Sequence, residues 1–361
     1  MKITFFIGSM VSGGAERVIS LLANHFANKN YDVDIALLLE NKVDNDLYRL
    51  HNNISIIDLT AKKTNSYFRN SFIWIKKIRE YLKKSKPDCV VSFIGRINAL
   101  VLTSSRGLHI PILVSERNDP KKDGRGRLMS LYCSHIYKRA KKIVFQTEYA
   151  KSCFPKLSPE KCIIIPNPVE VDRCSSVKKD PLMIASAGRL MPVKNHKMLI
   201  EAMGIVVRAF PNVKCHIYGK GEEGNNLKEQ IKESCLDEVV FLDGSKNNIG
   251  HYLSESSIFV LTSQYEGMPN ALIEAMMCEN ACISTRYSGV EDIIENGKNG
   301  LLVDCNDSEN LAKLIINLLS DNNKRSYLAQ QALFSSQKYA KPVVIELWEK
   351  TIKELTLNQE Q

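Results

Sequence analysis

The amino-acid sequence predicts an α/β protein with doubly wound, parallel sheets. Short apolar runs of strand length alternate with amphipathic runs of helix length through both halves of the chain. Two of these runs, 2–8 and 257–261, lead into turns containing glycine or proline before a helix, where open α/β sheets bind ligands. With 361 residues, the chain favours two domains over one, each able to bury its own core.

Composition limits the class of protein. The 44% apolar and 25% charged residues are ordinary for a globular protein. No apolar run reaches the roughly 18 residues that span a bilayer, and the apolar stretch at the amino terminus is too short for a signal peptide. The 10 cysteines include no C-x-x-C pair and the 7 histidines are scattered, so we expect buried thiols in a reducing cytosol.

Positive charge is concentrated in the first half. Residues 1–170 hold 28 Lys and Arg against 15 Asp and Glu, a net +13, whereas the remainder carries −4. Residues 62–86 and 117–142 form two basic clusters, and the first also contains Tyr67 and Trp74. One basic helix would equally suit a solvated surface, but two clusters favour an anionic membrane surface as a partner. No nucleic-acid partner is expected.

The first half contains seven expected strands and two prominent helices. The helix over 65–86 should bury a stripe of apolar side chains and expose its lysines. The loop between the first strand and helix 15–29 is rich in glycine but lacks a P-loop lysine, so we expect close backbone approach to a ligand there. The expected strands lie within 2–8, 33–39, 54–59, 88–95, 110–120, 142–147 and 161–166, and the stripe is Phe68, Phe72, Ile75, Ile78 and Leu82.

The second half repeats the alternation of strand and helix. A strand at 182–190 runs into a loop with Arg189 and Lys194, and one at 213–218 runs into a turn with Gly219 and Gly221. Further strands are expected at 238–244 and 257–261. The segments 283–294 and 300–307 are expected to form the closing turns of the domain, followed by helices within 307–337. A last helix at 342–355 presents Val344, Leu347 and Trp348 for packing on the first domain.

The stretch 262–277 carries the strongest chemical signal. Glu266 precedes a turn ending in Pro269, and a helix capped by Asn270 follows, with Glu274 about two turns further on. The first helical amides, those of Asn270, Ala271 and Leu272, point toward a bound anion. Carboxylates accept hydroxyl protons and amides donate to phosphate oxygens, so a nucleotide sugar suits this arrangement.

This spacing of two glutamates resembles the signature of retaining GT-B glycosyltransferases of family 4. The resemblance covers nearly the whole chain and includes GGAER at 13–17, GRL…VKN at 188–195 and the linker IPNPV at 165–169. It implies a GT-B architecture of two Rossmann-like domains facing a central cleft. We therefore expect an acceptor-side domain at 1–169, a nucleotide-sugar domain at 170–340, and a terminal helix at 341–361 that packs back on the first domain.

The resemblance also implies roles for individual residues. Glu266 would orient the donor sugar, while Arg189 and Lys194 would neutralise the departing diphosphate. Family members often carry a histidine near 117, and Arg117 here could grip an acceptor phosphate but could not accept a proton. The other expected donor-binding residues are Gly13, Gly14, Gly219, Gly221, Pro269, Asn270, Ala271, Leu272 and Glu274, and the acceptor-side residues are Arg96, Glu116, Arg117 and Asn118.

The expected reaction is transfer of a sugar from a nucleotide sugar, with UDP as the expected nucleotide and with retention of configuration. The expected acceptor is a glycan on a polyprenyl diphosphate, in lipopolysaccharide, O-antigen, capsule or glycoprotein assembly at the inner face of the cytoplasmic membrane. A GT-B nucleotide-sugar epimerase and a non-catalytic sugar-nucleotide-binding protein are the alternatives. No cofactor or metal is expected, because the D-x-D pairs at 32–34 and 44–46 read as structural.

Overall fold

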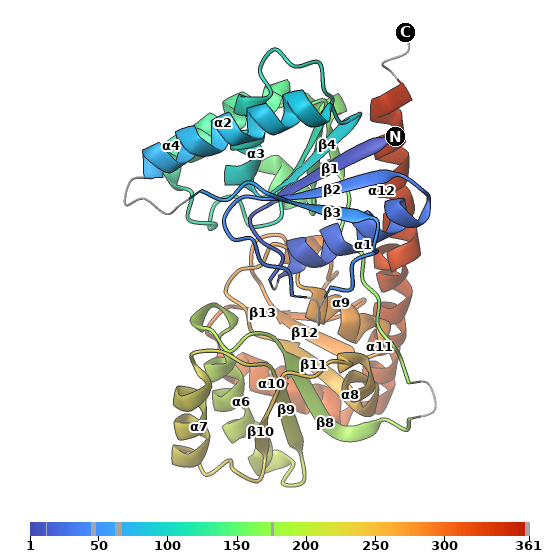
Figure 1. The fold of residues 1–361 in the computed structure, drawn as a ribbon. Helices are drawn as coiled ribbons and strands as arrows, with labels where there is room; N and C mark the ends of the chain where they lie inside the picture. The colour runs from blue at the N-terminus through green and yellow to red at the C-terminus, as the bar shows by residue number, and fades with distance from the viewer. Residues whose placement is uncertain (12, 45–47, 62–66, 175–176, 358–361) are drawn as a thin grey trace. The chain divides into compact units, whose positions relative to one another are not determined.

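The computed structural model describes residues 1–11, 13–44, 48–61, 67–174 and 177–357. Its backbone contacts divide the chain into two compact units (Figure 1). Unit 1 comprises Met1–Pro168 and Pro342–Gln361, and unit 2 comprises Val169–Lys341. Each unit holds one parallel sheet with helices on both faces, which confirms the predicted α/β class.

The sheet of unit 1 has seven parallel strands in the order β3-β2-β1-β4-β5-β6-β7. All seven predicted strands are present. The strand order reverses at β1, which pairs with both β2 and β4, so the carboxyl ends of β1 and β4 flank a topological switch point. The strands are β1 Lys2–Ile7, β2 Asp32–Leu37, β3 Ile54–Asp58, β4 Cys89–Phe93, β5 Ile112–Ser115, β6 Lys142–Phe145 and β7 Cys162–Ile164.

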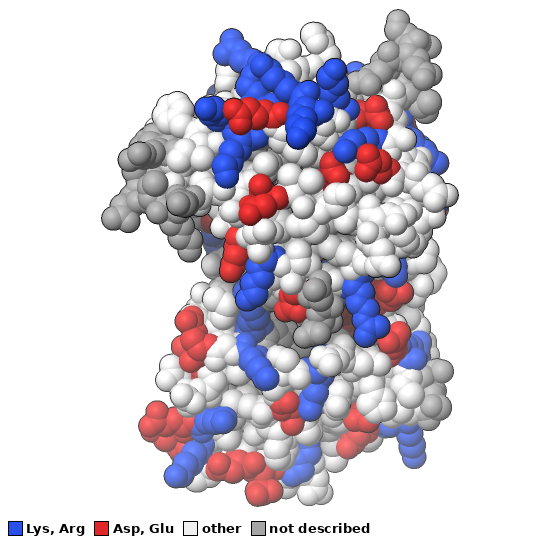
Figure 2. Space-filling view, viewed as in Figure 1, with Lys and Arg blue, Asp and Glu red and all other residues white. Residues whose placement is uncertain are grey.

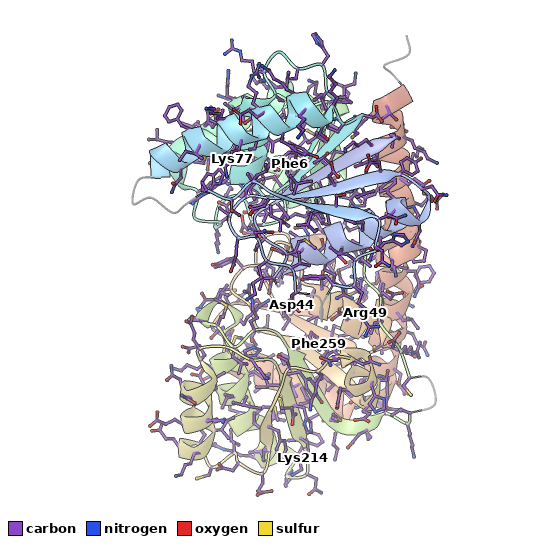
Figure 3. The ribbon with its side chains drawn as sticks, viewed as in Figure 1. Phe6, Asp44, Arg49, Lys77, Lys214 and Phe259 are labelled. Carbon is purple, nitrogen blue, oxygen red and sulfur yellow. The ribbon has the colours of Figure 1, made fainter. Side chains whose placement is uncertain are left out.

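Helices cover both faces of this sheet because its strands alternate apolar side chains between two cores. Phe5 of β1 enters a core shared with α1 and α12, whereas Phe6, labelled in Figure 3, enters the core beneath α2, α3 and α4. Both phenylalanines are fully buried. The helices are α1 Gly14–Asn28, α2 Tyr67–Ser85, α3 Gly95–Ser104, α4 Gly126–Ile136, α5 Glu148–Ser152 and α12 Lys341–Leu357.

The last helix, α12, belongs to the core of unit 1 although it follows the whole of unit 2 in sequence. Trp348 is fully buried, and its ring stacks on that of Phe93 of β4 with 5.7 Å between the ring centroids. Val344 is also buried, as predicted. Leu347 is 41% exposed, so the prediction that it faces inward was wrong. The helical period from Trp348 reaches Val344 and Ile352, and Leu347 lies off that stripe.

The basic helix predicted at 65–86 is α2, and its buried stripe differs from the prediction. Trp74, Ile78 and Leu82 are buried, whereas Phe72 is 73% exposed. The indole of Trp74 donates a hydrogen bond to the carbonyl of Leu38 at 2.8 Å, so this ring is core and not part of a membrane surface. Residues 62–66, and the side chains of Tyr67 and Phe68, lie outside the described residues.

Unit 2 contains a six-stranded parallel sheet in the order β10-β9-β8-β11-β12-β13. Here β8 pairs with both β9 and β11, and the fully buried Phe259 lies on β11 (Figure 3). The strands are β8 Asp180–Ala187, β9 Lys214–Tyr218, β10 Val240–Gly244, β11 Ser256–Leu261, β12 Ala281–Thr285 and β13 Leu301–Val303. The helices are α6 His196–Ala209, α7 Gly224–Glu233, α8 Ile249–Glu255, α9 Asn270–Met277, α10 Ser308–Ser320 and α11 Asn322–Ser336.

Candidate active site

The loop after β8 holds the two cations expected to act on the donor. The chain leaves the strand through Gly188 and the exposed Arg189, then forms a short 3₁₀ helix, Pro192–Lys194. Asn195 has a φ of 49°, in the left-handed region, and turns the chain into α6. The loop therefore presents Arg189 and Lys194 near the carboxyl edge of the sheet, at the switch between β9 and β11.

Gly219 and Gly221 are held against this loop by backbone contacts. A Cβ on Gly219 would lie 1.8 Å from the carbonyl oxygen of Gly188, and one on Gly221 would lie 2.2 Å from that of Leu190. The Gly188 amide donates to the carbonyl of Tyr218 at 2.9 Å. The two glycines are needed because the turn after β9 packs directly on the loop that carries Arg189.

The loop after β11 joins the same site. Lys194 Nζ lies 2.5 Å from Glu266 Oε1, and the hydroxyl of Ser263 donates to the same oxygen at 2.6 Å. Thr262 donates its hydroxyl hydrogen to the Lys194 carbonyl at 2.8 Å, and the amide of Gln264 donates to the Val193 carbonyl at 2.8 Å. The predicted donor residues Lys194 and Glu266 are thus brought together by neighbouring loops.

The helix after this loop, α9, begins at Asn270. Pro269 occupies the capping position, so Asn270 is the first helical residue and not the cap that the sequence suggested. The first backbone bond of the helix runs from the Ile273 amide to the Pro269 carbonyl, which leaves the amides of Ala271 and Leu272 ahead of it. Glu274 lies on the second turn and is 8% exposed.

The glycine-rich loop of unit 1 also takes the form predicted for it. Gly14 is the first residue of α1, and Gly13 precedes it in an extended conformation. The Gly13 amide is 3.1 Å from the hydroxyl of Tyr48, a residue that the sequence analysis did not select. A Cβ on Gly13 would meet a carboxylate oxygen of Glu16 at 2.2 Å, so side chains crowd this turn.

Of the four acceptor-side candidates, Glu116 is enclosed in unit 1 as part of a buried ion-pair network. Arg125 donates to it from both guanidinium ends, Nη1 to Oε1 at 2.9 Å and Nη2 to Oε2 at 2.6 Å, and Tyr137 donates to Oε1 as well. Asp123 accepts from Arg125 Nε at 2.6 Å. Arg125 was expected to belong to a surface basic cluster, but it is 6% exposed and neutralised by these carboxylates.

Arg117 is buried as well. Its guanidinium lies over the rings of Phe93 and Trp348, 5.0 Å and 5.1 Å from their centroids, and donates to Asn167 Oδ1 at 3.0 Å. Burial lowers the pKa of Arg117 to about 9. A grip on an acceptor phosphate would require this packing to open. Asn118 is exposed, and Arg96 is exposed while donating to the Gly124 carbonyl at 2.8 Å.

His196, the first residue of α6, is a titratable side chain beneath the Arg189 loop. It is 4% exposed and lies against the backbone of Gly188 and Arg189. Desolvation and, to a smaller extent, the Lys194 charge lower the pKa of the imidazole to about 4, so the ring is neutral at physiological pH. The residue supports the loop from below.

Of the aspartates in the two D-x-D pairs, Asp34 makes hydrogen bonds and an ion pair within the fold of unit 1. Asp34 is buried, accepts from the hydroxyl of Tyr81 at 2.5 Å and pairs with Lys2 at 3.0 Å. Asp46 lies outside the described residues. Within the part of the chain that is described, no three His, Cys, Asp or Glu side chains gather as candidate metal ligands. In that same part, no helix is long and apolar enough to cross a membrane.

Two family models together match most of the chain. The model described as Glycosyltransferase Family 4 matches residues 12–173, and the model described as Glycosyl transferases group 1 matches residues 170–333. The chain belongs to glycosyltransferase family 4. The second match contains both loops of the candidate donor site, including Arg189, Lys194 and Glu266.

Relatives of this glycosyltransferase align over nearly its full length. One is the GalNAc-alpha-(1->4)-GalNAc-alpha-(1->3)-diNAcBac-PP-undecaprenol alpha-1,4-N-acetyl-D-galactosaminyltransferase of Campylobacter jejuni, 29% identical over 98% of this chain and 99% of the relative. Another is the N-acetylgalactosamine-N,N'-diacetylbacillosaminyl-diphospho-undecaprenol 4-alpha-N-acetylgalactosaminyltransferase of the same organism, 25% identical over 94% of this chain and 96% of the relative. Among solved structures, Anabaena HepE in complex with UDP has 18% identity and a TM-score of 0.84, covering 98% of this chain and 100% of HepE. This likeness shows the GT-B fold.

In this glycosyltransferase, unit 2 offers a coherent set of groups for an anionic sugar donor. Arg189, Lys194 and the first amides of α9 can donate to phosphate oxygens, while Glu266 and Glu274 can accept from hydroxyls. All of them come from loops or helix starts after β8 and β11, which are paired strands. The residues that the sequence singled out for the donor therefore lie on neighbouring loops of unit 2.

Proposed function

We propose that this glycosyltransferase transfers a hexose-type sugar from a UDP-sugar to a glycan on a polyprenyl diphosphate, with retention of configuration. The observation that carries the proposal is the contact between Lys194 and Glu266, which places a cation beside a carboxylate at the switch point of unit 2. One group matches the diphosphate of such a donor and the other matches the hydroxyls of its sugar.

The proposed reaction is a same-face displacement at the anomeric carbon. The bond from this carbon to the UDP oxygen breaks, the acceptor hydroxyl oxygen bonds to the carbon on the same face, and its proton passes to the departing phosphate oxygen. Arg189, Lys194 and the α9 amides stabilise the charge on that phosphate, and Glu266 holds the sugar. Positioning and charge stabilisation are thus the contribution of the protein.

A prenyl-diphosphate acceptor is proposed on two grounds. The two Campylobacter relatives are named for acceptors that carry diphospho-undecaprenol. Unit 1 also exposes Leu128 and Leu131 of α4, at 84% and 66%, and Phe72 of α2, at 73%. Lys and Arg side chains gather over α2 on the face in Figure 2, with acidic groups among them. Exposed apolar and cationic side chains suit the inner, anionic face of the cytoplasmic membrane.

The donor and the stereochemistry are tested together. Thermal shift with a panel of nucleotide sugars should give the largest increase in melting temperature with UDP-sugars, since a bound ligand stabilises the folded state by mass action. Transfer from the best donor to a short prenyl-diphosphate glycan, followed by NMR of the new anomeric proton, should show the donor's configuration. An inverted product, or epimerised donor without transfer, would contradict the proposal.

We also propose that transfer needs no metal ion, since Arg189 and Lys194 supply the positive charge that a metal would bring to the leaving diphosphate. Activity should survive excess EDTA at the level seen with added Mg²⁺ or Mn²⁺. Loss of activity with EDTA and its recovery on adding the metal would show that the leaving group needs an ion.

A further inference from the structure

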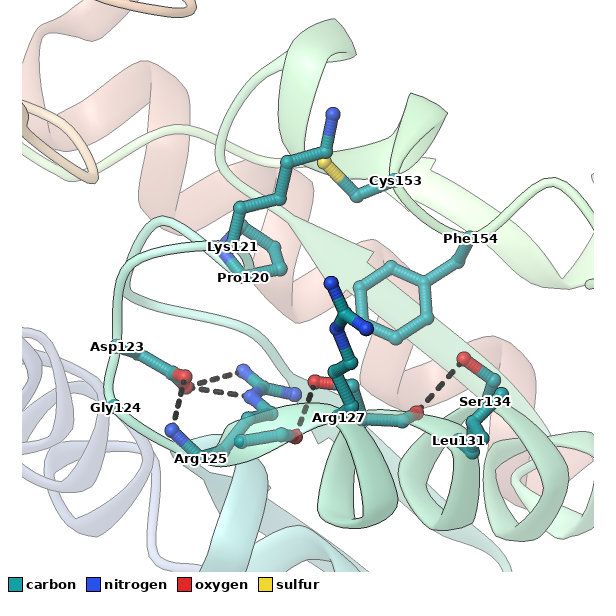
Figure 4. A pocket seen from close by; sticks show the side chains of 12 residues that line it. Pro120, Lys121, Asp123, Gly124, Arg125, Arg127, Leu131, Ser134, Cys153 and Phe154 are labelled. Atoms are coloured by element: carbon teal, nitrogen blue, oxygen red, sulfur yellow. Dashed lines mark hydrogen bonds and ion pairs between the residues drawn. The ribbon is translucent and has the colours of Figure 1, made fainter.

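Unit 1 contains a cavity of about 760 Å³ between α4 and the segment after α5. Lys121 and Arg127 line it together with two serines of α4, and Leu131 and Phe154 supply apolar surface (Figure 4). All of these residues belong to unit 1. Burial raises the pKa of the Cys153 thiol on its wall, which favours the neutral form of this side chain. The cavity therefore offers cationic, hydroxyl and apolar groups for binding.

The segment that forms one wall of the cavity buries its carboxylates and exposes several of its cations. Residues 116–127 contain five cations and three carboxylates, a net +2. The carboxylates point inward, with exposed fractions of 1% for Glu116, 4% for Asp119 and 7% for the Asp123 side chain. Lys121 and Arg127 are exposed. The positive excess of this segment therefore lies at the surface that a ligand would meet.

Two glycines make this sorting possible. Gly124 and Gly126 flank Arg125 with φ values of +74° and +70°, a region that other residues rarely adopt. The side chain of Arg125 turns inward to Asp123 and Glu116. In Figure 4 the side chains of Lys121 and Arg127 point instead toward Cys153 and Phe154. In the described part of the chain, neither Lys121 nor Arg127 has a carboxylate partner, and the amine of Lys121 lies 5.8 Å from the Tyr149 ring.

We propose that this cavity binds the diphosphate of a prenyl-diphosphate carrier, with the first part of the prenyl chain against Leu131 and Phe154. Two unpaired cations suit a diphosphate, which accepts charge-assisted hydrogen bonds along both phosphates. Apolar wall residues suit the hydrocarbon attached to it, and Leu128 and Leu131 extend that apolar surface along α4. The inference rests on the proposed acceptor class and assigns to it a site in unit 1.

The test measures binding separately from turnover. Farnesyl diphosphate is titrated against the full-length protein, the double variant Lys121→Ala/Arg127→Ala, and Ser134→Phe, which fills the cavity and keeps both cations. We expect the dissociation constant for farnesyl diphosphate to rise about tenfold or more in both variants. Lys141→Ala serves as the control, because this exposed lysine precedes β6, whereas the residues that line the cavity follow β5 or β6 in the chain.

Further binding measurements distinguish a prenyl diphosphate from UDP and from the phosphate of a lipid headgroup. Affinity for UDP should stay within about twofold of the parent protein in every variant, because unit 2 holds the nucleotide in the proposed function. Unchanged farnesyl diphosphate binding in both variants would overturn the inference. Competition between UDP and farnesyl diphosphate for the protein would also overturn it. So would a protein that binds phosphatidylglycerol vesicles but not farnesyl diphosphate, if the variants abolish the vesicle binding. Failure to bind any UDP-sugar while farnesyl diphosphate still binds would instead overturn the proposed function.

Discussion

Lys194 and Glu266 are 72 positions apart in sequence, yet their charged atoms lie 2.5 Å apart in unit 2. Their side chains are 18% and 13% exposed, so the pair is reachable from solvent but partly shielded from it. Ser263 donates to the same carboxylate oxygen at 2.6 Å and orients it. A phosphate oxygen bound to Lys194 would therefore lie next to the group that holds the sugar.

Glu266→Gln keeps the size of the side chain and removes its charge. We expect the transfer rate to fall about 100-fold or more, similar to the loss of other groups that stabilise a transition state. The melting temperature should change little, since the residue is not part of the core. Glu201→Gln, an exposed change on α6, is the control. Turnover near that of the control would remove Glu266 from the active site.

Arg189→Ala removes an exposed cation from the loop after β8. The transfer rate should fall about 100-fold or more because the charge on the departing diphosphate loses a donor. Affinity for UDP, measured by calorimetry, should fall as well. Arg208→Ala, at the other end of α6, should leave both quantities unchanged. Equal kinetics in the two variants would show that Arg189 does not contact the donor.

Gly221→Ala tests the packing beneath that loop. Its Cβ would lie 2.2 Å from the Leu190 carbonyl oxygen, so the loop with Arg189 must move. We expect weaker UDP binding together with a lower melting temperature. Gly204→Ala on α6 is the matched control, because its nearest neighbour would be 4.0 Å away. That change should stabilise the protein by about 0.5–1 kcal/mol, as expected for glycine within a helix. Similar behaviour of the two variants would contradict the packing argument.

His196 should make the stability of unit 2 sensitive to acid. Its folded pKa of about 4 lies below the unfolded value of about 6.5. Above pH 6.5 the ring is neutral in both states and contributes nothing. As the pH falls toward 4, the unfolded chain binds a proton that the folded chain excludes, and stability falls by up to about 3 kcal/mol.

His196→Gln should therefore reduce the fall in melting temperature between pH 7 and pH 4.5. Differential scanning calorimetry can follow the transition that UDP shifts upward, which belongs to unit 2 in the proposed function. His251→Gln, at a half-exposed histidine of α8, should retain the pH dependence of the parent protein. A parallel pH dependence in His196→Gln and the parent would show that burial of this ring has no energetic consequence.

Charge reversal on α2 tests the proposed membrane surface. Lys76, Lys83 and Lys84 are exposed, whereas Lys77 donates to the Thr60 carbonyl and is left unchanged. Each lysine near an anionic surface contributes about 1 kcal/mol of attraction. Lys76→Glu/Lys83→Glu/Lys84→Glu should release the protein from phosphatidylglycerol vesicles in sedimentation at low salt, and high salt should weaken binding of the parent protein.

The control for this experiment reverses three exposed lysines of unit 2, Lys228, Lys232 and Lys313, for the same change in net charge. That variant should sediment more fully than the α2 variant. UDP affinity should be the same in the parent protein and the α2 variant. A parent protein that stays in the supernatant at low salt would show that α2 is a solvated helix and that the acceptor is not presented by a membrane.

The sequence by itself determined the class of fold and placed the candidate donor residues beside strand ends. Strand-length apolar runs and helical periodicity are local properties, so strands β1 to β11 could be located before their neighbours were known, whereas β12 and β13 lie in segments read as closing turns. The placement of Arg189, Lys194 and Glu266 near strand ends followed from the same rule, since parallel strands bring their carboxyl ends to one edge. The sequence could not show that Lys194 and Glu266 touch.

Tertiary structure alone decided which charged and aromatic side chains face inward. Glu116 and Arg117 follow a strand just as the donor residues do, yet both are buried. Arg125, nine positions after Glu116, pairs with that carboxylate, and Trp348, distant in sequence, stacks on Arg117. Trp74 looked like a surface aromatic among lysines, and its indole instead reaches the Leu38 carbonyl. Burial depends on partners that fold in from elsewhere in the chain, and a buried charge persists where those partners hydrogen-bond to it or stack on it.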